Sequence, residues 1–76
     1  MNDQTLRERY VQLLLDRIRE DPYPSTTYMD MLEASVNDPE QFVEYVEALL
    51  EKVEATRFPS LSMLSRIQRI ATALPR

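Results

Sequence analysis

One stretch occurs twice in this chain: Tyr10-Val11-Gln12-Leu13-Leu14-Leu15-Asp16-Arg17-Ile18 aligns, after a shift of 35 positions, with Tyr45-Val46-Glu47-Ala48-Leu49-Leu50-Glu51-Lys52-Val53. The same shift lays Tyr23-Pro24-Ser25 on Phe58-Pro59-Ser60. Self-similarity at a fixed period is typical of one supersecondary unit used more than once. The sequence therefore predicts an internal repeat over residues 10–36 and 45–71.

Signals that start and stop helices divide each copy into two helices. The segment Thr5-Leu6-Arg7-Glu8 has the form of a capping box. It predicts a first helix that runs to Arg19 or Glu20, where Asp21-Pro22 ends it. Because glycine is absent, Asn37 is expected to take a left-handed conformation after the second helix. The expected N-caps of the other helices are Ser25, Asp38 and Ser60, and their expected ends lie near Val36, Ala55 and Ala73.

Apolar residues at helical spacing predict a buried stripe on each helix. No long alternation predicts a strand, so we expect an all-α fold: a small four-helix bundle made of two duplicated helical hairpins with pseudo-two-fold symmetry, as a single domain over residues 1–76. Tyr23 and Phe58 are expected to fill the corners of the hairpins. The expected stripes are Val11, Leu14, Leu15 and Ile18; Phe42, Val46, Leu49, Leu50 and Val53; Met29, Leu32 and Val36; and Leu64, Ile67 and Ala71.

The composition excludes several classes of site. The 76 residues include no Cys and no His, so the sequence offers no disulfide, no thiolate ligand and no imidazole base. Paired carboxylates such as Asp16 and Glu20 lie on polar helical faces, where solvent surrounds them. We therefore expect no enzyme activity, no metal site, no cofactor and no small-molecule substrate. A core of this size stabilises by only roughly 3–5 kcal/mol, so we expect self-association, for instance a homodimer, to add stability.

The sequence also predicts where the protein works. Residues 1–4 lack the basic and apolar regions of a signal peptide. The longest apolar run, Leu13-Leu14-Leu15, is far shorter than the ~20 residues that span a bilayer. We therefore expect a cytoplasmic protein with no membrane association.

Differences between the two copies indicate a candidate surface. Leu6 and Leu13 lie about 120° from the core stripe of the first helix, with Tyr10 between them and the core. Met31 is a fourth large apolar side chain, on the second helix. Two interpretations are open: the copies have drifted and these side chains fill an uneven core, or they form an exposed strip that binds a partner helix or a second copy of the chain. Their counterparts in the second copy are Gln41, Tyr45, Ala48 and Arg66.

The charges are distributed unevenly along the chain. All 13 acidic residues lie at or before Glu54 with five basic ones, which gives that stretch a net charge of −8, whereas residues 55–76 carry four arginines and no acid. Arg57, Arg66 and Arg69 are therefore candidate anion-binding residues. With serines and Arg76, Arg66 and Arg69 are expected to share the polar side of the last helix. Nucleic acid is the less favoured partner, because the acidic part of the chain would repel it.

The aromatic-Pro-Ser motif also has two interpretations. Each copy places backbone N–H groups at a helix start, where an anion can bind, but an aromatic plug, a helix breaker and a cap explain the same residues without a ligand. The favoured function is a small helical protein-interaction module or regulatory subunit that binds a partner helix or itself. The alternative is a DNA-associated regulator that contacts phosphates through the Arg-bearing last helix.

Overall fold

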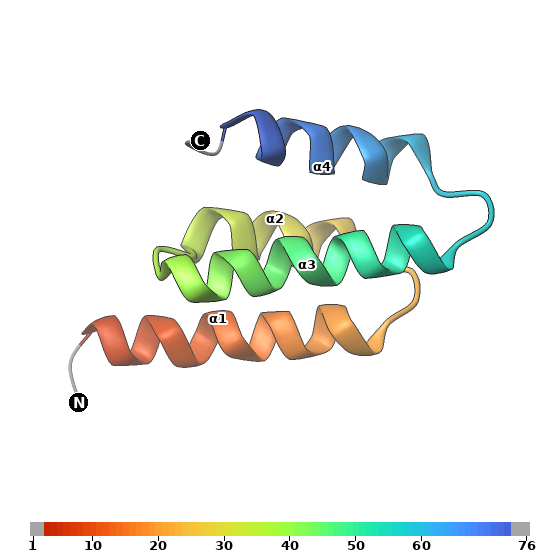
Figure 1. The fold of residues 1–76 in the computed structure, drawn as a ribbon. Coiled ribbons are helices and arrows are strands. Elements are labelled where there is room, and N and C mark those ends of the chain that lie inside the picture. The colour runs from red at the N-terminus through yellow and green to blue at the C-terminus, as the bar shows by residue number, and fades with distance from the viewer. Residues whose placement is uncertain (1–2, 74–76) are drawn as a thin grey trace. The chain divides into compact units, whose positions relative to one another are not determined.

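Four helices make up most of the molecule (Figure 1). The computed structural model describes residues 3–73, and within this range there is no strand. The helices are α1 (Asp3–Glu20), α2 (Thr26–Ser35), α3 (Pro39–Ala55) and α4 (Leu61–Ala73). The predicted all-α class with four helices is therefore confirmed.

The chain divides into two compact units, residues 1–45 and 46–76. The first unit holds α1, α2 and the start of α3, and the second holds the rest of α3 and α4. The boundary between Tyr45 and Val46 falls inside α3, at the point where the second copy of the repeat begins. The single domain over residues 1–76 stays a prediction.

Side-chain caps start three of the helices as the sequence predicts. Ser25 Oγ accepts a hydrogen bond from the backbone N–H of Tyr28 at 3.3 Å, and Ser60 Oγ accepts one from the N–H of Met63 at 3.1 Å. The Asp38 carboxylate accepts from the N–H of Glu40 at 3.3 Å, directly before the proline that opens α3. Each cap satisfies a donor that has no partner inside the helix.

Two predicted helix ends are wrong. α1 is already helical at Asp3, so Thr5 lies inside the helix and is not its N-cap. Asn37 is not left-handed, because no described residue has a positive φ. The chain instead leaves α2 through an extended Val36 (φ −70°, ψ 132°) whose N–H donates to the carbonyl of Leu32.

The first unit has most of the core that helical spacing predicts, but Val36 and Phe42 are only half-buried. α1 packs against α2, and burying these stripes removes apolar surface from water, which is the main favourable term in folding. Tyr45 of α3 is also wholly buried. The buried side chains of α1 and α2 are Val11, Leu14, Leu15 and Ile18, with Met29 and Leu32.

The predicted stripes of α3 and α4 are wrong in part. Leu49 is buried as expected, but Leu50, Leu64 and Ala71 are exposed. On both helices the buried face is rotated by about 100°, or one residue, from the face that the apolar pattern predicts. On α3 the polar contacts that Gln41 and Tyr45 make with α1 and α2 fix this orientation. The buried residues of the two helices are Gln41, Tyr45, Ala48 and Leu49 on α3, and Arg66 and Ile70 on α4.

The two corner aromatics are not plugs. Tyr23 and Phe58 are 82% and 83% exposed. Tyr23 belongs to a tight turn in which its N–H donates to the Asp21 carboxylate at 2.9 Å. The Phe58 ring faces the Arg57 guanidinium, whose carbon lies 5.6 Å from the ring centroid. A turn held by hydrogen bonds needs no aromatic filling, so both rings project into solvent.

Candidate partner-binding site

The four side chains of the predicted apolar strip are all exposed. Leu6 and Leu13 of α1 are each 51% exposed, and Tyr10 of α1 and Met31 of α2 are 39% and 38% exposed. Spacings of four and three residues place Leu6, Tyr10 and Leu13 on one side of α1. We call these four residues the apolar strip. The interpretation that they fill an uneven core is therefore wrong.

The apolar strip lies on the face of the first unit that is turned away from α3. On α1, Glu8 and Gln12 contact α3 through Gln41, and they stand on the opposite side of the α1 core stripe from Leu6, Tyr10 and Leu13. On α2, Glu33 contacts Tyr45 of α3, and it stands on the opposite side of the α2 core stripe from Met31. Both helices thus turn one flank to the start of α3, and the side chains of the apolar strip on the other flank are exposed.

Sequence reasoning missed a fifth residue of this face. Tyr28 is 43% exposed and lies one turn before Met31 on the same flank of α2. The i, i+3 spacing between Tyr28 and Met31 is a signal that could have identified it. A tyrosine is a common contact residue because it offers a large apolar ring with a polar tip.

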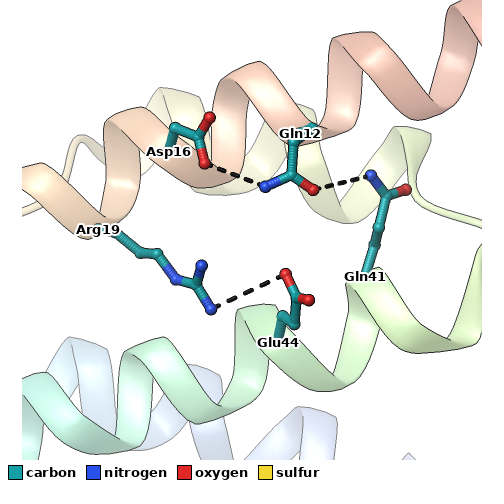
Figure 2. Close-up of polar contacts among 5 residues, drawn as sticks. All are labelled: Gln12, Asp16, Arg19, Gln41 and Glu44. Carbon is teal, nitrogen blue, oxygen red and sulfur yellow. Dashed lines mark hydrogen bonds and ion pairs between the residues drawn. The ribbon is translucent and has the colours of Figure 1, made fainter.

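A polar seam joins α1 to the start of α3 (Figure 2). The Gln41 side-chain amide donates to the Glu8 carbonyl oxygen at 2.8 Å and to Gln12 Oε1 at 3.3 Å. Gln12 in turn donates to Asp16 at 3.0 Å. At the other end of the seam Arg19 and Glu44 form an ion pair at 3.8 Å. The seam is partly buried, and it therefore sets the register of α3 against α1.

The predicted anion-binding arginines do not share one face. Arg57 and Arg69 are exposed, but Arg66 is only 7% exposed. Arg66 lies one turn from the buried Ile70, and a long aliphatic stem makes the burial of an arginine less costly. The prediction that Arg66 and Arg69 share an exposed polar side of α4 is therefore wrong, and Arg76 lies outside the described residues.

The described residues provide no other candidate centre. Residues 3–73 hold no group of three or more acidic side chains that could bind a metal ion. Every buried side-chain nitrogen or oxygen among them has a hydrogen-bond partner. In the same part of the chain, each helix is too short or too polar to pass through a lipid bilayer. The exposed apolar side chains therefore provide the candidate surfaces: the apolar strip of α1 and α2, and Leu50, Leu61 and Leu64 on α3 and α4.

Comparison with known proteins gives no relative. No protein-family model matches the chain, and neither the curated proteins nor the solved structures contain a significant match.

Proposed function

We propose that this chain is a small, non-enzymatic, cytoplasmic interaction module or regulatory subunit that binds a partner helix, or itself, through the apolar strip. One observation carries the proposal: Leu6, Tyr10, Leu13 and Met31 are all exposed, on the flanks of α1 and α2 opposite the contacts with the start of α3. Exposed apolar patches rimmed by polar residues mark interaction sites in soluble proteins.

The spacing of the apolar strip suits a helical partner. Side chains at i, i+4 and i+7 form a ridge along one side of α1, and helix-binding surfaces use the same spacing to anchor an apolar helix face. Arg17 continues the ridge after Leu13 and is exposed. A charge at the end of an apolar ridge orients a partner of opposite charge.

The DNA-associated alternative has less support. Arg66 is buried, so α4 presents fewer arginines to a phosphate backbone than its sequence predicts. An electrophoretic shift with duplex DNA at low salt, lost on replacing Arg57 and Arg69, would restore this alternative, because phosphate contacts weaken steeply as salt rises.

We also infer that the two hairpins, α1–α2 and α3–α4, are duplicated copies of one unit. Six identical positions under one shift support this inference. Their pseudo-two-fold relation is less well supported, since a two-fold axis gives equivalent residues equal surroundings. Tyr10 and Tyr45 are equivalent, yet Tyr10 is exposed and Tyr45 is buried.

The proposed function is tested with Leu13→Ser and a matched control. Leu61→Ser makes the same change at an exposed leucine of α4, outside the apolar strip. Tagged wild-type protein and both variants are purified from native cells in low salt, and the masses of the intact complexes are measured. We expect Leu13→Ser to lose the wild-type complex and Leu61→Ser to keep it. Identical complexes from all three proteins would refute a binding role for the apolar strip.

A further inference from the structure

The repeat relates the exposed apolar strip to a surface that is buried in the same molecule. The shift of 35 carries Leu6, Tyr10, Leu13 and Met31 onto four residues of α3 and α4. Each of those four residues is less than 9% exposed. One face of the repeated unit is thus open in the first copy and covered in the second. The four covered counterparts are Gln41, Tyr45, Ala48 and Arg66.

The contacts inside the first unit show what covers two of these counterparts. Gln41 donates to the Glu8 carbonyl oxygen and to Gln12 of α1. Tyr45 donates its hydroxyl proton to the Glu33 carboxylate of α2. Gln41 and Tyr45 are therefore covered by one flank of the α1–α2 hairpin, the flank opposite the apolar strip.

Applied to these contacts, the shift of 35 gives three complementary pairs. The fourth contact, between Gln12 and Gln41, becomes Glu47 and Leu6, which are not complementary. The partners of the Arg19–Glu44 ion pair become Glu54 and Arg9, so the charge changes sign on both sides and remains complementary. The polar contact between Glu8 and Gln41 becomes an apolar one between Val43 and Leu6.

The remaining contact is also preserved in kind. The shift of 35 turns the Glu33–Tyr45 pair into Gln68 and Tyr10, which can still share a hydrogen bond. All six residues of the three complementary pairs are exposed, as residues of an intermolecular contact must be in a single chain. Val43 is 51% exposed, and Leu50, which is 41% exposed, lies two turns further along the same flank of α3, between Glu47 and Glu54.

We propose that the occupant of the apolar strip is a second copy of this chain, bound head to tail. In this contact the acidic flank of α3 (Val43, Glu47 and Glu54) of one copy packs on Leu6, Arg9 and Tyr10 of the next copy. The inference depends on the proposed function, since it names the partner of the apolar strip. The two surfaces differ, so each copy keeps one of them unused, and association continues into chains or closes into a ring.

Charge supports a second copy over other helical partners. Arg9 and Arg17 lie beside the apolar strip on α1, together with Asp16 and Glu20, whereas the flank of α3 carries Glu47 and Glu54. An interface between two identical strips offers Arg9 no contact with Glu54, because the strip does not include α3. A head-to-tail interface brings arginines to glutamates.

Two blocked variants test the head-to-tail contact. Leu6→Glu with Arg9→Glu blocks the apolar strip and leaves the acidic flank of α3 intact. Val43→Arg with Glu54→Arg blocks the acidic flank and leaves the apolar strip intact. All four positions are exposed, and circular dichroism checks that both variants are folded. Each purified protein is then studied by sedimentation, alone and in an equimolar mixture.

We expect the mass of the wild-type protein to rise with concentration above the 9.0 kDa of one chain. Each blocked variant alone is expected to stay monomeric at concentrations at least tenfold higher. Their mixture is expected to form a one-to-one dimer that does not grow, because only one complementary pair of surfaces remains.

Two results overturn the head-to-tail contact. A wild-type protein that stays monomeric up to about millimolar concentration has no such contact, since a Kd above 1 mM is too weak to matter. If the variant with Val43→Arg and Glu54→Arg still dimerises alone, the dimer forms between two identical apolar strips instead. In the first case, loss of the cellular complex in Leu13→Ser would leave the proposed function standing with a different partner. In the second case the partner is still a second copy, bound through identical strips, so the two failures are distinguishable.

Discussion

Among the tyrosine hydroxyl groups, we expect that of Tyr45 to stabilise the fold most. Its side chain is wholly buried and its hydroxyl donates to the Glu33 carboxylate. Tyr45→Phe removes a hydrogen bond to a charged group, and we expect the free energy of unfolding to fall by about 1.5–3 kcal/mol. Tyr10→Phe makes the same change at the exposed equivalent position and is expected to cost less than about 0.5 kcal/mol. Urea denaturation measures both, and equal losses would contradict this account of Tyr45.

Gln41 gives a second residue-scale prediction. Its amide donates to two oxygens, the Glu8 carbonyl and Gln12 Oε1. Gln41→Glu replaces the donor by a carboxylate that faces both acceptors in a buried position, and we expect a loss of about 2–3 kcal/mol. Gln41→Leu removes the polar group together with its need for a partner and is expected to cost less. If thermal unfolding showed Gln41→Leu to be less stable than Gln41→Glu, the hydrogen bonds of Gln41 would not determine the stability of this contact.

Individual residues show which burial the sequence could predict and which it could not. The stripe Val11, Leu14, Leu15 and Ile18 followed from spacing alone and is buried. Tyr10 and Tyr45 could not be told apart, because both are tyrosines in nearly identical local sequence. What separates them is a neighbour distant in sequence, Glu33, and no local pattern encodes such a contact.

At the scale of the element, the serine caps determine where helices begin. Ser60→Ala removes the acceptor of the Met63 N–H, and we expect a loss of about 1 kcal/mol in the free energy of unfolding. Ser62→Ala is the matched control: it lies within α4 and is exposed, where alanine is the better helix former. Circular dichroism during denaturation should show Ser60→Ala less stable than Ser62→Ala. The reverse order would mean that the cap does not stabilise α4.

Helix ends could be predicted better than helix faces. Prolines and caps act within three or four residues, so the ends at Glu20, Ala55 and Ala73 came out close to their observed places. The inward face of a helix depends on what packs against it. The hydrogen bonds between Gln41 and α1 orient α3 so that its buried face is about one residue away from the predicted one. The apolar pattern of α3 alone did not reveal this orientation.

At the scale of the whole molecule, the candidate site followed from comparing the two copies. The sequence identified Leu6, Tyr10, Leu13 and Met31 because large apolar side chains stood where the second copy has Gln41, Ala48 and Arg66 at three of these positions. Whether they were core or surface could not be decided, since spacing does not say which flank of a helix is covered. Their observed exposure decides this in favour of a surface.

The thermal midpoint of the whole protein is expected to depend on its concentration. A partner that binds only the folded state stabilises it by mass action, so each tenfold rise in concentration above the Kd for self-association adds up to about 1.4 kcal/mol. For a domain of this size, 1 kcal/mol moves the midpoint by about 4–8 °C. Leu13→Ser, at a half-exposed position of the apolar strip, should melt at one temperature across the dilution series. Leu61→Ser should follow the wild type, because it leaves the strip unchanged. A rise that Leu13→Ser shares with the wild type would place the contact between copies elsewhere on the surface.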